Sequence, residues 1–194
     1  MPRTSRVVAV GSPHHITQRG NNCELVFFDD ADRSAYLEHL SFFTRKYQID
    51  IWAYCLMSNH LHLLVVPQAP ESLARGIGLT NMSYTQHINR KYRRSGRVWQ
   101  NRFFSSVVET ESYLWAVARY IEKNPVVAGV VDTAEDYRWS SAAYHLQSRP
   151  DPYLKSPSWL SDHERKAYAL FHNAEDSQRM TALIELSEPG NRPI

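Results

Sequence analysis

The sequence predicts an α+β fold: a ferredoxin-like sandwich in which helices cover one face of an antiparallel sheet. Two observations carry this prediction. Segments with strand and helix periodicity follow one another in the order β-α-β-β-α-β-α, and one pair of strand segments is joined by a two-residue turn. With 43% hydrophobic and 22% charged residues among its 194, the chain can bury a core and is not a disordered chain.

The first half of the chain predicts a strand, a helix and a hairpin. Residues 7–10 and 14–19 form one interrupted strand. A helix over 33–47 follows from apolar side chains at helical spacing, with Asp30 or Asp32 as the candidate cap.

Residues 49–57 and 60–66 are two strand-prone runs joined by the tight turn Ser58-Asn59. This is the clearest hairpin in the sequence. A second helix is expected over 71–93 and a fourth strand over 100–108.

An amphipathic helix is expected over 109–124. Pro125 should stop it, because the residue before a proline is pushed out of the helical region. Later segments contain Pro, Ser and Asp, with one helix at about 161–172. The sequence therefore predicts a domain over 1–145 and a C-terminal appendage or tail over 146–194.

Basic residues are concentrated in one stretch. The formal net charge is +2, yet residues 72–108 hold seven basic side chains and no acidic one. Aromatic residues such as Tyr92 and Trp99 are interleaved with them, which favours a surface for a polyanion such as single-stranded nucleic acid. The alternative interpretation is a solvated basic end of a helix.

Membrane and disulfide-rich classes are excluded by simple counts. No apolar run approaches the roughly 18 residues that a spanning helix needs, and the first residues lack the apolar core of a signal peptide. Cys23 and Cys55 cannot build a disulfide framework and form no CxxC pair. We therefore expect a cytoplasmic protein without a membrane partner.

Two segments could together do chemistry. His60 and His62 are two apart on a strand, so both imidazoles project from one face and could form half of a metal site. Tyr120 and Asn124 are four apart on a helix and share a face, which could present a nucleophile and an oxygen ligand. Ordinary sheet histidines and a residue pair at the edge of the core are the alternatives. Tyr113 is a rival nucleophile without a matching amide.

Five segments carry a family resemblance: HHITQRGNN (14–22), CLMSNHLHLLV (55–65), WQNRFFS (99–105), YLWAVARYIEKNPVVAGVV (113–131) and YRWSSAAYH (137–145). In this order they resemble the single-tyrosine HUH transposases, named for a His-hydrophobic-His strand. More narrowly, they are similar to the REP-associated tyrosine transposases. One departure is His14, where a tyrosine is usual, and the tail after 145 is less well matched.

The resemblance implies an HUH endonuclease fold and a role for each matching residue. Tyr120 would be the nucleophile, and a divalent metal, Mg²⁺ or Mn²⁺, would be bound by His60, His62 and Asn124. The implied substrate is single-stranded or hairpin DNA of the REP type, cleaved and rejoined through a 5′-phosphotyrosine link. Monomer and homodimer both stay open.

Further residues complete the expected site. Asn59 and His15 are candidates for the shell behind the metal ligands, although for His15 an ordinary strand histidine is the stronger reading. The expected DNA contacts are Arg19, Arg90, Lys91, Arg93, Arg94, Arg97, Trp99 and Arg102.

Other classes of protein fit less well. A non-catalytic single-stranded nucleic-acid-binding module could use the same sheet, but no RNP signature occurs and the two site segments would be unexplained. A structural zinc protein would group four Cys or His ligands. A replication or conjugation nickase would share the chemistry but commonly shows other motif orders.

Overall fold

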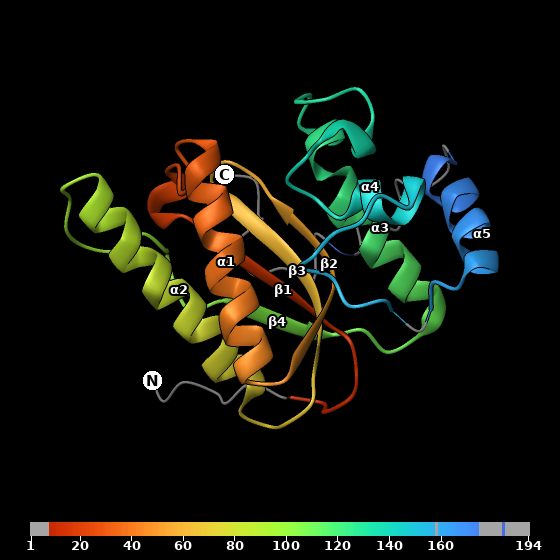
Figure 1. Cartoon of the computed structure of the whole chain (residues 1–194), viewed down its shortest axis with the longest axis horizontal. Coiled ribbons are helices and arrows are strands. Elements are labelled where there is room, and N and C mark those ends of the chain that lie inside the picture. The colour runs from red at the N-terminus through yellow and green to blue at the C-terminus, as the bar shows by residue number, and fades with distance from the viewer. Residues whose placement is uncertain (1–7, 158, 175–183, 185–194) are drawn as a thin grey trace.

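The computed structural model describes residues 8–157, 159–174 and 184. Its strands and α-helices follow the order β1-α1-β2-β3-α2-β4-α3-α4-α5 along the chain (Figure 1). The strands are β1 (His14–Arg19), β2 (Ile49–Leu56), β3 (His60–Pro67) and β4 (Phe104–Val107), the α-helices are α1 (Asp30–Lys46), α2 (Ser72–Lys91), α3 (Glu111–Val127), α4 (Ala142–Gln147) and α5 (Asp162–Asn173), and two short 3₁₀ turns cover Asn21–Cys23 and Ala134–Asp136.

The four strands form one antiparallel sheet in the order β2-β3-β1-β4. β1 pairs with both β3 and β4, and β2 pairs with β3 through the predicted hairpin. This strand order confirms the predicted ferredoxin-like class, in which the two central strands come from the two halves of the motif.

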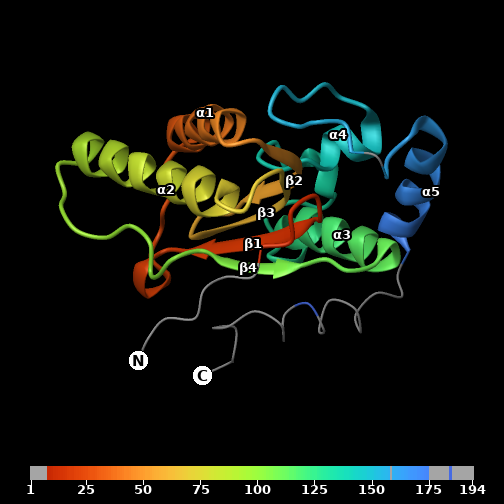
Figure 2. The same cartoon turned by 90° about the horizontal axis from the view of Figure 1, so that it is seen from below.

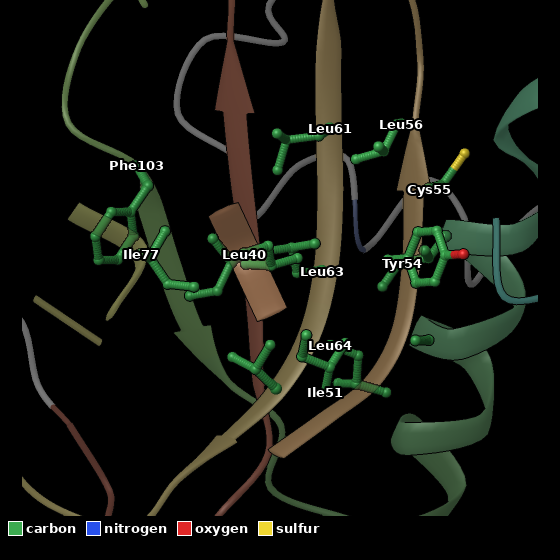
Figure 3. Close-up of a cluster of buried hydrophobic side chains, with 14 of the residues drawn as sticks. Leu40, Ile51, Tyr54, Cys55, Leu56, Leu61, Leu63, Leu64, Ile77 and Phe103 are labelled. Carbon is green, nitrogen blue, oxygen red and sulfur yellow. The ribbon is translucent and has the colours of Figure 1, made fainter. Parts of the chain in front are cut away.

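The two faces of β3 serve different purposes. Leu61 and Leu63 point into the core beneath α1 and α2, where Figure 3 shows them close to Leu40 and Ile77. Figure 2 shows α1 and α2 together on that side of the sheet. The intervening His62 points to the opposite face of the sheet, where it contacts Tyr120 of α3. The expectation that all helices lie on one face is thus wrong for α3, because only long-range packing decides which face a helix covers.

Helix α1 begins with a reciprocal cap. The N-cap is Asp29, whose carboxylate accepts from the backbone N–H of Asp32 at 2.8 Å, while the Asp32 carboxylate accepts from the Asp29 N–H at 3.4 Å. The prediction that Asp30 or Asp32 is the cap is therefore wrong by one residue. The pair is a capping box in which an aspartate takes the usual place of glutamate.

Pro125 lies within α3, so the prediction that it stops the helix is also wrong. In the last turn the proline forfeits only its own N–H bond. The true stop is Gly129, with a φ of 65°, because its N–H bonds to the Val126 carbonyl and the next N–H, of Val130, bonds to the Pro125 carbonyl. This is a Schellman end, which needs the left-handed conformation that glycine adopts freely.

Two strand predictions are too long. Val7 lies outside the described residues, and Val8–Val10 form no strand. The fourth strand is limited to Phe104–Val107, although an isolated bridge between Gly20 and Trp99 extends its alignment with β1.

The chain beyond 145 is packed on the rest of the structure as far as it is described. Backbone N–H groups of Leu56 and Ser141 bond to the carbonyls of Trp139 and Tyr54, so residues 139–141 cover the outer edge of β2. Further on, the Asp151 carboxylate accepts from the Tyr54 hydroxyl at 2.7 Å, and Tyr168 of α5 is fully buried. Among the described helices, none is long and apolar enough to cross a membrane.

Gly20 gives a test of this packing. A methyl group at this position would lie 2.2 Å from the Glu24 carbonyl oxygen and 2.8 Å from Val26 Cγ1, whereas one on Gly78 in α2 would meet nothing. We expect Gly20→Ala to lower the free energy of unfolding by about 1–3 kcal/mol and Gly78→Ala to raise it by about 0.5–1 kcal/mol. Urea unfolding curves measure both. A Gly20→Ala protein as stable as the parent would contradict the close approach.

Candidate active site

The turn between β2 and β3 fixes the orientation of His60. Asn59 donates its side-chain amide to the Cys23 carbonyl at 3.2 Å, which settles the direction of the amide. Its Oδ1 then lies 2.7 Å from Nδ1 of His60. Because a carbonyl oxygen only accepts, His60 carries its proton on Nδ1 and presents the lone pair of Nε2. The contact between Asn59 Oδ1 and His60 Nδ1 is consistent with the predicted orienting role of Asn59.

Asn124 brings a second acceptor to the same point. Its side-chain amide donates to the Tyr120 carbonyl one turn earlier on α3, at 3.2 Å, so Oδ1 faces the opposite way. That oxygen lies 3.3 Å from Nε2 of His60. Two lone-pair atoms therefore converge with no proton assigned between them, an arrangement that a cation would stabilise.

His62 lies beside them and contacts both His15 and Tyr120. Its Nδ1 is 3.1 Å from Nε2 of His15, and these two rings are stacked with centroids 5.3 Å apart. The Tyr120 ring meets the His62 ring edge-on at 5.4 Å and the His15 ring at 5.9 Å. The register pairs His15 with Leu64 and Thr17 with His62, so strand alternation puts the two imidazoles on one face of the sheet. Tyr120 reaches them from α3.

Burial keeps these histidines neutral. It lowers the pKa of His15 to about 3. Burial, together with the charges of His60, His15 and Arg19, also lowers the pKa of His62 well below its usual value. For His60, burial lowers the pKa by more than the contact with Asn124 raises it. The group therefore offers neutral imidazoles, the form that binds metals.

The residues present fit a divalent metal with an open coordination sphere. Within the part of the chain that the structure describes, no three or more His, Cys, Asp or Glu residues form a metal cluster. The arrangement instead has two imidazoles and one amide oxygen, with a single direct contact between ligand atoms. Such a set leaves coordination positions for water or substrate oxygens, as in catalytic rather than structural sites.

The structure separates the two candidate tyrosines. Tyr120 contacts His15 and His62 and shares one helix turn with Asn124. Tyr113 lies at the start of α3, where its backbone N–H bonds to the side chain of Thr110, and its ring packs against the core. Only Tyr120 is therefore in the histidine group among the described tyrosines.

The basic residues lie on β1 and in the segment from the end of α2 to β4. Arg19 pairs with His60 across β1 and β3, so it lies on the same face of the sheet. Beyond α2, the Val98 carbonyl accepts from the N–H of Asn21, which holds the basic segment against the turn after β1. The exposed cations between residues 90 and 102 are Arg90, Lys91, Arg93, Arg97 and Arg102, and Arg94 is half-buried.

Two of the expected DNA contacts have other roles in the fold. Lys91 donates to Asp29 at 2.7 Å and to the fully buried carboxylate of Asp32 at 2.7 Å, so its charge is neutralised within the protein. Trp99 is 8% exposed, its Nε1 donates to the Asn81 carbonyl, and its ring packs on Tyr36. The assignment of Trp99 to the DNA surface is corrected: it is a core residue.

One residue of this region was missed. Glu122, between Tyr120 and Asn124, is completely buried and bonded to side chains from α4 and α5. A charged residue on an amphipathic helix is ordinarily solvated. Its only sequence signal is its position directly after Ile121 in the apolar part of α3.

The fold and the histidine–tyrosine group define a class of protein. A ferredoxin-like sheet with a His-Leu-His strand facing a helix that bears Tyr and Asn is the arrangement that the sequence resemblance to HUH transposases implied. The chain belongs to the IS200-like transposase family, which its residues 12–124 match. That range ends at Asn124 and covers the whole sheet with α1 and α2.

Two comparisons show which members of the family this chain is similar to. A Haemophilus influenzae protein named as a REP-associated tyrosine transposase is 28% identical over 62% of this chain and 71% of its own length. A solved structure of a REP-associated tyrosine transposase bound to a REP hairpin has a TM-score of 0.66 and 16% identity, covering 83% of this chain and 94% of that one. The resemblance inferred from the motifs is thus confirmed, and the shared fold extends beyond the family match.

The structural role of Lys91 can be tested against its neighbour. Lys91→Met removes the ammonium partner of the buried Asp32 carboxylate, so we expect a measurable fall in Tm. Arg90→Met changes an exposed side chain and should leave Tm unaltered. Differential scanning calorimetry measures the Tm of both variants. Equal Tm values would show that the ion pair between Lys91 and Asp32 contributes nothing to stability.

Proposed function

We propose that this protein cleaves and rejoins single-stranded DNA at REP-type hairpins, through a covalent 5′-phosphotyrosine intermediate and with a divalent metal. One observation carries the proposal. Nε2 of His60 and Oδ1 of Asn124 converge at 3.3 Å as two acceptors beside Tyr120, and His62 completes the group. An acceptor cluster next to a phenol suits phosphodiester cleavage by a tyrosine.

Tyr120 would attack the scissile phosphorus through its Oη. The new O–P bond joins the tyrosine to the 5′ phosphate, and the bond between phosphorus and the 3′ oxygen breaks. The phenol gives up its proton to solvent and the leaving 3′ oxygen takes one up, so a 3′-hydroxyl is released and protons balance. A free phenol has a pKa of about 10 and needs activation near pH 7. Because the intermediate is covalent, the reverse attack by a 3′-hydroxyl rejoins the strand without an external energy source.

His60, His62 and Asn124 would hold the metal. When bound, a divalent ion stabilises negative charge on a phosphate oxygen and orients the backbone for in-line displacement. Asn59 and His15 would hold the two imidazoles in their rotamers, since each contacts the ring nitrogen on the far side from the site. Two imidazoles favour Mn²⁺ over Mg²⁺ in affinity, although both carry out phosphoryl chemistry.

The DNA would cross the basic surface. Arg19 lies beside His60, and its guanidinium is suited to a phosphate next to the scissile one. The cations at the end of α2 and beyond it would hold further phosphates, so binding should weaken steeply with salt. The hairpin substrate is supported by the relative of similar fold that was solved on a REP hairpin.

The nucleophile can be tested directly. We expect the protein, with Mn²⁺ and a labelled oligonucleotide that contains a REP-like hairpin, to form an adduct that survives denaturation and maps to Tyr120. Tyr120→Phe removes the attacking oxygen and should abolish the adduct while hairpin affinity changes less than about threefold. Denaturing gels and peptide mass spectrometry give the readout.

Tyr113→Phe is the matched control, and it should form the adduct at the parental rate. An adduct retained in Tyr120→Phe and lost in Tyr113→Phe would reassign the nucleophile. Hairpin binding without an adduct in the parent, over several hairpins and both metals, would instead favour a non-catalytic DNA-binding module.

The metal ligands make a separate prediction. His60→Ala should abolish saturable Mn²⁺ binding in isothermal titration calorimetry, because it removes the atom that converges with Asn124. Asn59→Ala should weaken Mn²⁺ binding by about 10- to 100-fold, since His60 loses the partner that fixes its tautomer. His87→Ala, on α2, is the control and should bind as the parent does. Unchanged affinity in His60→Ala would refute the assigned site.

A further inference from the structure

Glu122 is a buried carboxylate that the proposed reaction does not use. It lies two residues from both Tyr120 and Asn124 on α3, and at 100° per residue it therefore points away from them. Its side chain is 0% exposed. A carboxylate in such a position needs several partners to offset the loss of water.

The structure supplies these partners from two segments, the start of α4 with its N-cap and α5. Ser141 donates its hydroxyl to Oε1 at 2.6 Å, and His145 of α4 donates Nδ1–H to the same oxygen at 2.5 Å. Tyr168 of α5 donates its hydroxyl to Oε2 at 2.9 Å, and Nε2 of His172 lies 3.7 Å from that oxygen. One carboxylate thus joins α4 and α5 to the back of α3.

The charge on this carboxylate is stabilised where it lies. Burial raises the pKa of Glu122, but the charge and hydrogen bond of His145, with His172 and Ser141, outweigh burial and hold the pKa below its usual value. Burial also raises the pKa of Tyr168 well above its usual value, so its hydroxyl stays a donor. Hydrogen bonds to a charged group are strong and directional in an interior without water, so together they allow only one arrangement of these side chains.

Ser141 extends the network to the sheet. Its backbone N–H bonds to the Tyr54 carbonyl at 3.0 Å, and its hydroxyl accepts from the Tyr54 N–H at 3.2 Å. Tyr54 is on β2, and the next residue of β2, Cys55, is the register partner of His62 on β3. A continuous series of contacts therefore runs from the histidine strand through Ser141 and Glu122 to the tyrosine helix.

We propose that Glu122 is a positioning residue for strand cleavage. Its bonds to Ser141, His145 and Tyr168 hold α3 at the rotation and height where Tyr120 and Asn124 meet the histidines. This inference rests on the proposed function of Tyr120. The partners of Glu122 all follow residue 124, outside the range that matches the transposase family, so the C-terminal segment has a task in the reaction.

Two variants weaken the network, and one control removes a buried hydrogen bond away from it. Glu122→Gln keeps the shape and removes the charge, and Tyr168→Phe removes one donor while its ring stays. Thr44→Val removes a buried hydroxyl that donates to the Leu40 carbonyl at 2.7 Å, in α1 on the other face of the sheet. For each protein we would measure Tm, hairpin Kd, Mn²⁺ affinity and the single-turnover cleavage rate at saturating hairpin.

We expect Glu122→Gln to lower the saturated cleavage rate by about tenfold or more, with a smaller loss for Tyr168→Phe, because small displacements of a nucleophile are costly. Mn²⁺ affinity should fall several-fold, since Asn124 moves with α3, while hairpin Kd stays within twofold. Thr44→Val should lower Tm alone. Rates and metal affinities that follow Tm equally in all three variants would overturn the proposal.

The two proposals can fail separately. If the parent protein forms no adduct, the proposed function fails, and the Mn²⁺ titrations still decide the role of Glu122. Unchanged Mn²⁺ affinity in both Glu122→Gln and Tyr168→Phe would then refute positioning. If the parent cleaves and both variants cleave at its rate, only the inference about Glu122 is wrong.

Discussion

The two-residue side-chain period of β3 is the constraint on which the rest of the structure depends. Leu61 and Leu63 must face α1 and α2 to close the core, so His60 and His62 must face the other way. A slip of one residue would bury the imidazoles among leucines and expose the leucines to α3. The free energy that holds the core therefore also holds the two histidines on one face, and Asn59 and His15 then only have to orient their rings.

Helix α3 is under a different constraint, because it is joined to the sheet by side chains rather than by a backbone ladder. Asn124 contacts His60 on one side, and Glu122 bonds to His145 of α4 and Tyr168 of α5 on the other. Burying a carboxylate is costly unless each of its bonds is made, so this contact stabilises the fold only in one arrangement. The Schellman end at Gly129 then turns the chain back toward the segment that supplies those bonds.

Local rules predicted what depends on local geometry. Strand alternation placed His60 and His62 together, helical spacing paired Tyr120 with Asn124, and the order of elements gave the sheet. The same rules could not place α3 on the histidine face, nor Trp99 in the core, since both follow from contacts between distant segments. Glu122 was beyond them for the same reason: its partners lie 19 to 50 residues later, and a glutamate in an amphipathic helix ordinarily faces water.

Two asparagines show how the site is made of acceptors. Asn59 and Asn124 each donate the amide to a backbone carbonyl, of Cys23 and Tyr120, so each must present its oxygen to His60. The Asn59 oxygen accepts a hydrogen bond from Nδ1–H of His60. The Asn124 oxygen therefore faces the lone pair on Nε2. Protonation of His60 would satisfy both oxygens, but burial opposes it by lowering the pKa. Nε2 of His60 and Oδ1 of Asn124 thus face each other without a proton between them. This is the electrostatic condition for a cation site next to Tyr120.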